Sequence, residues 1–336
     1  MKPLVLLTTS ALATDLLFSA GSRDELDESF EVVVVAGNDP AFDELLPRAF
    51  AVIGQPDLPA ERLRRAERLT VICNVEGNFF PNVDYEACFD RRIRVLSCGP
   101  VYAQPVAEYA LGLALDLARG ITHGDRDFRA GRERYTQDGT AGSVLLRHAD
   151  VGLIGMGNVC RALLPLLRPF APTVRVHDPW LPRRALADLD VEPVELDDLL
   201  TASTFVFVLA ASTTENTHLL DGRRLALIPA GGRLVLVSRA AAVDFGALYE
   251  RVAAGHLLAA VDVWPAEPVP ADDPSRRLEG MVLSAHRAGG IPSAFPLIGE
   301  MVVDDLRQVL AGLPPVRMQS AAPELVARYR NKPVER

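Results

Sequence analysis

The sequence has few cysteines, no excess of positive charge and no long hydrophobic run. Four of its 336 residues are cysteine, and none lies in a CxxC pair or at metal-ligand spacing from a histidine, which argues against a zinc site. The formal charge of −9 argues against nucleic acid and anionic membrane surfaces as partners. No stretch approaches the roughly 18 apolar residues that a membrane-spanning helix needs. These absences predict a cytoplasmic protein without a metal, and they leave a small anionic substrate open.

Length and composition indicate a folded chain of about two domains, at roughly 150 residues each. Hydrophobic residues make up 49% and charged residues 24% of the sequence, the usual mix of a globular protein. The apolar run after Lys2 could belong to a signal peptide. Pro3, Asp15 and several hydroxyl residues interrupt that run, however, so a first β-strand is the preferred interpretation.

Short apolar segments alternate with helical patterns in two series. The first series has strand-like segments at 4–8, 31–35, 51–54, 69–73 and 93–97, with helical patterns at 59–69 and 84–90. The second has strand-like segments at 151–155, 174–178, 205–210, 233–238, 258–264 and 281–285. Strands that are apolar throughout and separated by helices are typical of a parallel sheet covered on both faces.

Other segments connect or follow the two series. A largely buried helix is predicted over 105–119, with Pro105 near its start. The polar stretch 123–142 shows little periodicity and predicts a long connection, either a solvated loop or an arm that packs on another subunit. A helix over 295–311, ended by Gly312, follows a segment rich in glycine and proline, and we expect it to return to the first domain.

A glycine-rich turn, Gly155-Met156-Gly157, follows the first strand of the second series. The first glycine permits a tight turn, and the second lets a pyrophosphate approach the backbone. The helix start that follows presents free N–H groups to that anion. Cys160 stands where a third glycine is common, and it is small enough for the helix to lie near the strand.

Asp178 ends the next strand, 21 residues after Gly157. A carboxylate there can accept hydrogen bonds from both ribose hydroxyls of NAD and would repel the 2′-phosphate of NADP. A plain strand–helix turn can also contain two glycines. The preceding strand and Asp178 together favour a dinucleotide site, with NAD as the cofactor.

Three polar residues follow the carboxyl ends of three strands in the second series: Arg239, Glu267 and His286. Ligands bind at that edge of an open parallel sheet. Hydride transfer between NADH and a keto acid needs a cation for the substrate carboxylate, a proton donor for the carbonyl oxygen, and a partner that keeps the donor protonated. Arginine, histidine and glutamate supply these three functions.

The segments that carry these residues resemble the D-isomer-specific 2-hydroxyacid dehydrogenases, in particular phosphoglycerate dehydrogenase-like members without a regulatory domain. The matching segments, in chain order, are VGLIGMGNVCRALLPLLRPF, HDP, LVSRAAAVD, AAVDVWPAEPVP and SAHRAGG. The order and spacing match from Val71 onward.

The resemblance implies an α/β fold of two doubly wound parallel-sheet domains with a cleft between them. A flavodoxin-like substrate domain would comprise 1–100 plus 290–336, and a Rossmann NAD-binding domain 101–289. The resemblance also implies a homodimer that forms through the NAD-binding domain.

The resemblance assigns a role to each matching residue. Arg239 would bind the substrate carboxylate, His286 would be the general acid/base, and Glu267 its partner. Asp262 would hold the nicotinamide carboxamide. The full set implied to meet the cofactor is Gly155, Met156, Gly157, Asn158, Val159, Asp178, Val237, Asp262 and Gly289. The loop implied to meet the substrate, through backbone N–H groups, is Val75, Glu76, Gly77 and Asn78.

The sequence departs from the family pattern in the substrate loop, where Phe79 and Pro81 replace a glycine and an acid. Phe79 and Phe80 either wall a pocket for a larger or flatter substrate, or at least one of them packs in the cleft between the domains. Arg287, directly after His286, either meets a second anionic group on the substrate or points to solvent or to an acid.

The sequence therefore predicts an NAD-dependent oxidoreductase that interconverts a small 2-keto acid and a D-2-hydroxy acid. The alternative is an NAD(H)-sensing regulatory module of the same fold, like the family's corepressor branch. Oxidation of formate or phosphite is a third interpretation. Glu267 argues against formate, because the formate branch pairs its histidine with glutamine. The sequence does not identify the particular 2-hydroxy acid.

Overall fold

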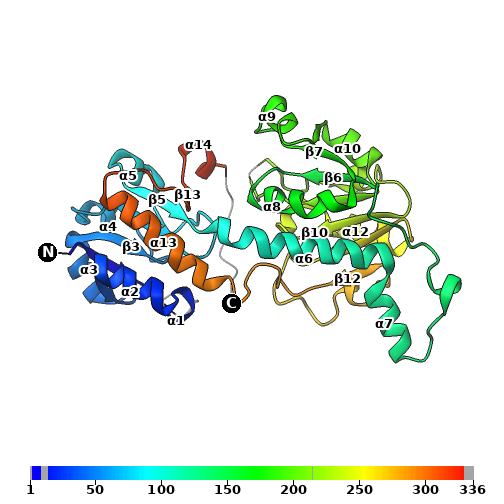
Figure 1. The fold of residues 1–336 in the computed structure, drawn as a ribbon, viewed down its shortest axis with the longest axis horizontal. Coiled ribbons are helices and arrows are strands. Elements are labelled where there is room, and N and C mark those ends of the chain that lie inside the picture. The colour runs from blue at the N-terminus through cyan, green and yellow to red at the C-terminus, as the bar shows by residue number, and fades with distance from the viewer. Residues whose placement is uncertain (1, 9–13, 214, 329–336) are drawn as a thin grey trace. The chain divides into compact units, whose positions relative to one another are not determined.

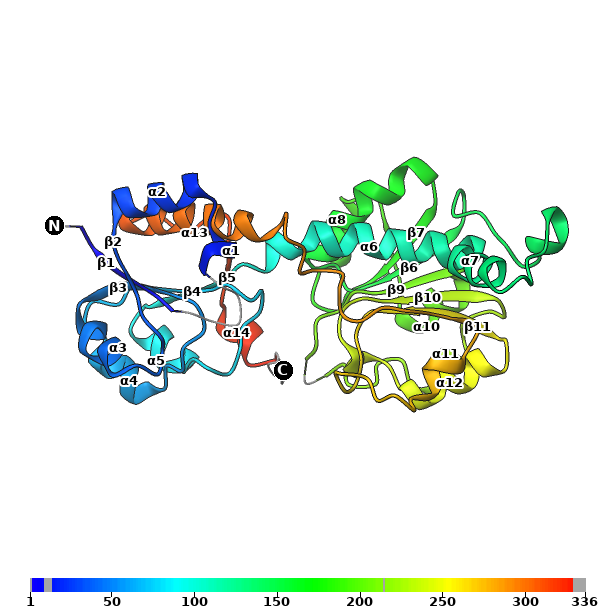
Figure 2. The same ribbon diagram turned by 90° about the horizontal axis from the view of Figure 1, so that it is seen from below.

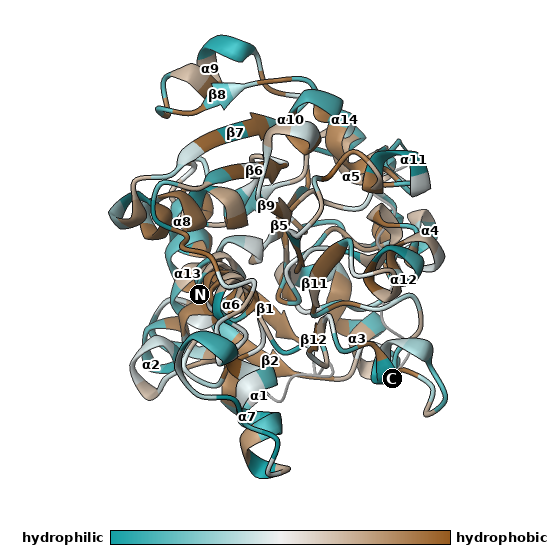
Figure 3. Ribbon diagram, turned by 90° about the vertical axis from the view of Figure 1, so that its right-hand side faces the viewer, coloured by the Kyte–Doolittle hydropathy of each residue, from teal (hydrophilic) through white to brown (hydrophobic). Residues whose placement is uncertain are grey.

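The computed structural model describes residues 2–8, 14–213 and 215–328. The chain divides into two compact units. Unit 1 contains the described residues up to 102 together with those from 290 onward, and unit 2 contains 103–289. Many of the strands in both units are largely brown, and so hydrophobic, in Figure 3, as buried parallel strands are expected to be, whereas the short edge strand β8 (Glu192–Pro193) is teal.

Unit 1 is built on a six-stranded sheet with the order β13-β5-β4-β3-β1-β2. Strands β1 to β5 pair in parallel, and β13 adds an antiparallel edge. The order β2-β1-β3-β4-β5 is that of the flavodoxin-like fold. The strands are β1 (Leu4–Leu7), β2 (Glu31–Val34), β3 (Ala49–Ile53), β4 (Val71–Asn74), β5 (Arg94–Ser97) and β13 (Gln319–Ser320).

Helices cover both faces of the unit 1 sheet (Figures 1 and 2). One face carries α1 (Thr14–Leu17), α2 (Ala20–Ser29) and α13 (Phe295–Leu310). The other carries α3 (Pro40–Leu45), α4 (Ala60–Arg65) and α5 (Tyr85–Asp90), with the 3₁₀ turn Leu46–Arg48 after α3 and α14 (Pro323–Val326) near α5. Gly299 lets α13 lie close to α1, because a Cβ there would stand 2.5 Å from the Leu17 carbonyl oxygen.

Unit 2 is built on a seven-stranded parallel sheet with the order β12-β11-β10-β9-β6-β7-β8. Counted from β6, this is the Rossmann order 3-2-1-4-5-6 with one further strand, and the order reverses between β6 and β9. The strands are β6 (Asp150–Ile154), β7 (Thr173–His177), β8 (Glu192–Pro193), β9 (Phe205–Val208), β10 (Gly232–Leu236), β11 (Leu257–Val261) and β12 (Met281–Leu283). The two doubly wound α/β sheets predicted from the sequence are confirmed.

Helices cover both faces of the unit 2 sheet (Figure 2), and each face has its own hydrophobic layer. One face packs against α6 (Gly99–Arg119) and α8 (Asn158–Leu167). The other packs against α10 (Leu196–Ala202), α11 (Gly222–Leu225) and α12 (Phe245–Ala253). The remaining elements are α7 (Ile121–Arg129), α9 (Arg183–Ala187) and the 3₁₀ turns Thr136–Gly139, Arg168–Phe170, Ala240–Ala242 and Pro274–Arg277.

Two sequence expectations were wrong in detail. The helix expected from Pro105 begins at Gly99, so Pro105 lies inside it rather than near its start. The polar stretch expected to be a connection contains α7, although none of the described residues of α7 is buried. Side-chain pairs four residues apart support this helix, namely Arg129 with Asp125 at 2.8 Å and His123 with Asp127 at 3.3 Å. Such local pairs do not produce an apolar periodicity.

Two kinds of feature are absent from the described residues. None of the helices in this part of the chain is long and apolar enough to cross a membrane. No group of three His, Cys, Asp or Glu side chains within the same residues could hold a metal ion.

The first prediction concerns the four cysteines, which are all buried and unpaired. Burial raises the pKa of the thiols of Cys88, Cys98 and Cys160 to about 12, and raises that of Cys73 further. Because the thiolate is the reactive form, we expect no reaction with a disulfide reagent at pH 8 in the folded protein. Four thiols should react after unfolding in denaturant, which serves as the control. Rapid reaction of the folded protein would contradict this packing.

Candidate active site

The predicted site residues of unit 2 gather at one edge of its sheet. Each follows the carboxyl end of a strand: Gly155 follows β6, Asp178 follows β7, Arg239 follows β10, Asp262 and Glu267 follow β11, and His286 follows β12. The turn after β6 lies against residues just after β9, where the strand order reverses. Ligands of open parallel sheets bind at this place.

The two glycines of the turn have different surroundings. Gly155 has φ +92°, and a Cβ there would stand 2.7 Å from Cα of Ala210, so the backbone requires glycine. Gly157 has an extended backbone, and a Cβ there would have no described atom within 4 Å. Gly157 also precedes Asn158 and Val159, the first residues of α8. The start of α8 is thus open for a pyrophosphate to reach its N–H groups.

Asp178 lies directly beside the glycine turn. Its Oδ2 accepts a hydrogen bond of 2.8 Å from the Met156 N–H, and its Oδ1 accepts one of 2.9 Å from the Trp180 N–H. Each carboxylate oxygen can accept more than one hydrogen bond, so ribose hydroxyls can still bind to it. The open Gly157 and the fixed Asp178 therefore fit an adenine dinucleotide.

His286 and Glu267 form a hydrogen-bonded pair. Nδ1 of His286 lies 2.8 Å from Oε2 of Glu267, and Oε1 of Glu267 accepts the Trp264 N–H at 3.0 Å. Because an ionised carboxylate only accepts hydrogen bonds, Nδ1 must carry a proton. The other ring nitrogen, Nε2, is then the one that can exchange a proton with a substrate.

Arg239 belongs to the same cluster. Burial lowers the pKa of its guanidinium, and the negative charge of Glu267 partly opposes this effect. One amino group of the guanidinium donates to the Ser238 carbonyl oxygen at 2.7 Å. An arginine remains a cation at neutral pH after any such shift. The structure thus combines a partly buried cation, a carboxylate and an imidazole.

Asp262 holds the loop that carries His286. Its buried carboxylate accepts hydrogen bonds from the Ser284 hydroxyl, from the Arg287 N–H at 2.8 Å and from the Ala288 N–H at 3.1 Å. The sequence interpretation missed this role and the part of Ser284 in it. A contact of Asp262 with the nicotinamide carboxamide stays a prediction. The side chain of Arg287 is exposed, Val237 is buried just after β10, and Gly289 ends unit 2.

The loop 75–78, predicted to bind substrate, follows β4 at the carboxyl edge of the unit 1 sheet. Gly77 has φ +88°, and a Cβ there would lie 2.7 Å from the ring of Tyr102. The Tyr102 hydroxyl donates to the Val75 carbonyl oxygen at 3.1 Å. These contacts fix the path of the loop.

Phe79 packs in the core of unit 1, a place that the sequence interpretation did not consider, and the role of Phe80 stays a prediction. Its side chain lies in the hydrophobic core and meets the Tyr85 ring edge-to-face, with centroids 6.3 Å apart. The Tyr85 hydroxyl donates to the Phe80 carbonyl oxygen at 2.7 Å. An aromatic residue after a loop can fill a core as readily as a pocket, and the sequence pattern does not distinguish the two.

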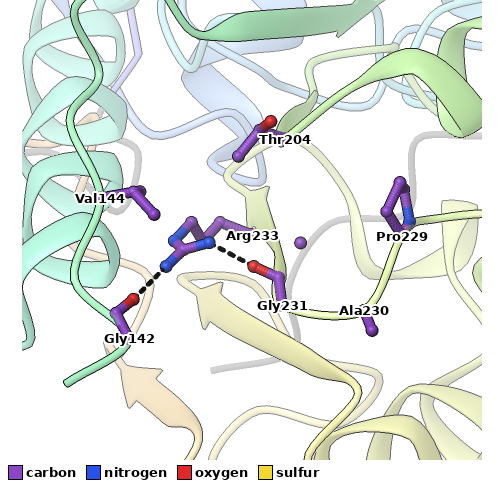
Figure 4. A pocket seen from close by; sticks show the side chains of 8 residues that line it. Gly142, Val144, Thr204, Pro229, Ala230, Gly231 and Arg233 are labelled. Atoms are coloured by element: carbon purple, nitrogen blue, oxygen red, sulfur yellow. Dashed lines mark hydrogen bonds between the residues drawn. The ribbon is translucent and has the colours of Figure 1, made fainter.

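A pocket of about 340 Å³ lies at the opposite, amino-end edge of the unit 2 sheet (Figure 4). Buried Arg233 crosses it and donates to the Gly231 carbonyl oxygen and, at 2.7 Å, to that of Gly142. Arg233 thereby ties the segment after α7 to the sheet. The pocket is lined by Gly142, Val144, Thr204, Pro229, Ala230, Gly231, Gly232 and Arg233, and it is separate from the strand-end cluster.

Comparison with known proteins identifies the family. Residues 111–288 match the model of the D-isomer specific 2-hydroxyacid dehydrogenase, NAD binding domain. The match covers more than half of the chain and includes every strand of the unit 2 sheet. The chain belongs to this family, and its unit 2 is an NAD-binding domain.

Individual relatives cover more of the chain. D-3-phosphoglycerate dehydrogenase of Archaeoglobus fulgidus is 28% identical over 94% of the chain and 58% of its own length, and that of Mycobacterium tuberculosis is 29% identical over 81% and 50%. The chain thus spans about half the length of these curated relatives. Hydroxypyruvate reductase of Thermotoga maritima is 28% identical over 88% of the chain and 93% of its own length. A phosphoglycerate oxidoreductase from Rhizobium etli has a similar structure, with a TM-score of 0.87, 42% identity and coverage of 96% and 99%.

The second prediction uses the contrast between the two glycines. Gly155→Ala should lower the free energy of unfolding by more than about 1 kcal/mol, because it forces an alanine into a left-handed conformation against Ala210. Gly157→Ala should leave stability unchanged or slightly raised, and should weaken NADH binding by about tenfold or more. Chemical denaturation and fluorescence titration with NADH measure the two effects. A Gly157→Ala variant with normal NADH affinity would show that the cofactor does not approach this turn.

Proposed function

We propose that the protein is an NAD-dependent oxidoreductase that interconverts a small 2-keto acid and a D-2-hydroxy acid. The observation that carries the proposal is the hydrogen bond between His286 and Glu267, in the same cluster as Arg239 at the strand-end edge of an NAD-binding domain. Such a cluster can bind a substrate that has a carboxylate next to a carbonyl, beside a cofactor that donates hydride. Phosphoglycerate, glyoxylate and hydroxypyruvate, which appear in the names of relatives, all contain or yield such groups.

Each side chain has one task in the reaction. Arg239 binds the substrate carboxylate and polarises the neighbouring carbonyl. NADH, when bound, supplies the hydride to the carbonyl carbon. His286 transfers the proton from Nε2 to the carbonyl oxygen, so that the ketone becomes a hydroxyl and the imidazole becomes neutral. Glu267 stabilises the protonated ring and keeps its orientation. In the oxidative direction His286 takes the hydroxyl proton.

The remaining assignments complete the proposal. Unit 2 binds NAD through the glycine turn and Asp178. Unit 1 acts as the substrate domain and offers backbone N–H groups of loop 75–78 to the carboxylate. Arg287, exposed and next to His286, supplies a second positive charge, which suits a substrate with a further anionic group. Four unpaired cysteines are compatible with a reducing compartment such as the cytoplasm.

The third prediction tests His286. The wild type should oxidise NADH in the presence of one or more members of a panel of 2-keto acids, and should prefer NADH to NADPH. His286→Ala should lower kcat by a factor of about 100 to 10,000 and leave NADH affinity nearly intact. Spectrophotometric turnover and NADH titration measure these values.

Two outcomes would contradict this proposal. A folded His286→Ala variant that loses NADH binding and turnover equally would remove the role assigned to His286. A wild type that binds NADH tightly and reduces no member of the panel would favour the NAD(H)-sensing alternative.

The fourth prediction concerns assembly. The segment 120–146, here called the connecting arm, exposes large apolar side chains: Ile121 at 59%, Phe128 at 64%, Tyr135 at 68% and Leu145 at 66%. Exposed apolar groups gathered on one segment mark a surface that another protein covers. We propose that this arm joins two copies through their NAD-binding domains.

Light scattering should therefore give a dimer for the wild type and a monomer for Phe128→Asp combined with Leu145→Asp. Leu313→Asp, which alters a half-exposed leucine of unit 1, is the control and should remain dimeric. A monomeric wild type at micromolar concentration would contradict the proposal.

A further inference from the structure

The loop that carries His286 has an unusual backbone. His286 has φ +52°, in the left-handed region that residues with a side chain rarely occupy. Such a conformation persists only where surrounding contacts determine it. The contacts that impose it also set the position of the imidazole.

Asp262 provides most of these contacts. Its main-chain carbonyl accepts the His286 N–H at 2.7 Å, and its carboxylate accepts the N–H groups of Arg287 and Ala288. Three successive residues are thus bound to one aspartate. The orientation of its carboxylate decides where the loop lies.

Two hydrogen bonds between side chains, from Tyr109 to Ser284 and from Ser284 to Asp262, orient this carboxylate. Oδ1 of Asp262 accepts from the Ser284 hydroxyl, and the Ser284 oxygen lies 2.8 Å from the hydroxyl of Tyr109. Because the carboxylate cannot donate, the Ser284 proton must point to Asp262. The serine oxygen then accepts, and the Tyr109 hydroxyl donates. The three groups therefore have one consistent arrangement of protons, in which each bond polarises the next.

Tyr109, the first donor in this series of hydrogen bonds, lies on a firmly packed helix. It lies on α6, whose neighbouring residues Ala107, Ala110 and Leu113 are buried in the core of unit 2. A group on a packed helix holds its partner more firmly than a group on a loop. The Trp264 indole also donates to the Ser284 carbonyl oxygen at 2.7 Å, so both ends of Ser284 are fixed.

We propose that Tyr109 is a positioning residue for His286, which it orients through Ser284 and Asp262. The proposal rests on the function proposed above for His286. Tyr109 touches neither the imidazole nor Glu267 in the described contacts, so its effect must pass through the loop. Loss of its hydroxyl should misplace the proton donor and leave the NAD site at the glycine turn unchanged.

The test compares Tyr109→Phe, Ser284→Ala and the double variant. Each single variant should lower kcat by about tenfold or more and change the NADH dissociation constant by less than about twofold. Because Tyr109 acts on Asp262 only through Ser284, the double variant should have a kcat no lower than that of Ser284→Ala alone. Ser284→Thr, which keeps the hydroxyl, should retain most of the wild-type kcat.

Tyr249→Phe is the matched control. The Tyr249 hydroxyl donates to Asp273 at 3.0 Å within the same unit, and none of the described hydrogen bonds joins this pair to Ser284, Asp262 or His286. This variant also loses a tyrosine–aspartate contact, and it should keep the wild-type kcat. Wild-type kcat in a folded Tyr109→Phe variant would overturn the proposal. Additive losses of kcat in the double variant, or a loss of kcat in Tyr249→Phe equal to that in Tyr109→Phe, would also overturn the proposal.

A readout independent of turnover separates this proposal from the proposed function. In protein labelled on its histidine rings, the NMR signals of His286, assigned with His286→Ala, should shift in Tyr109→Phe and stay in place in Tyr249→Phe. If the wild type reduces no keto acid and the signals still shift, the proposed function fails and the positioning role stands. Normal turnover with unmoved signals would refute the positioning role alone.

Discussion

The parallel direction of the strands in the unit 2 sheet is the constraint on which the candidate site depends. Because β6 to β12 all run the same way, every strand delivers the residue after it to one edge. The strand order reverses between β6 and β9, and the helices that follow these two strands cover opposite faces of the sheet. The turn containing Gly155 contacts Ala210 at this point. Arg239, Glu267 and His286 come from distant parts of the chain and reach the same edge for this reason.

Buried carboxylates satisfied by backbone N–H groups recur in both units. Asp262 binds the loop after β12, and Asp305 on α13 accepts the N–H groups of Val316, Arg317 and Met318 just before β13. A buried acid without such partners would be costly, whereas one that accepts several N–H groups fixes a segment that has no regular structure of its own. In each unit one acid thereby holds an irregular segment next to the last strand of the sheet, after β12 in unit 2 and before β13 in unit 1.

The sequence predicted the order of strands and helices well, because apolar runs and their spacing depend on local composition. It also predicted which residues follow the strands, since a tight turn such as Gly155–Gly157 requires glycine for reasons that are visible in a few neighbouring residues. It did not predict α7, which ion pairs rather than burial support, or the start of α6 before Pro105. The contacts of Ser284 and Tyr109, 175 residues apart, depend on tertiary packing, and no sequence pattern indicates them.

The anchorage of Arg233 bears on how the connecting arm could meet a partner. One end of the arm continues from α6, and the other is clamped where the guanidinium holds the Gly142 carbonyl against the sheet. A segment restrained at both ends loses less conformational entropy on association than a free tail of equal length. Its apolar side chains are therefore displayed from a partly preorganised scaffold, which favours recognition by a rigid, complementary surface over coupled folding.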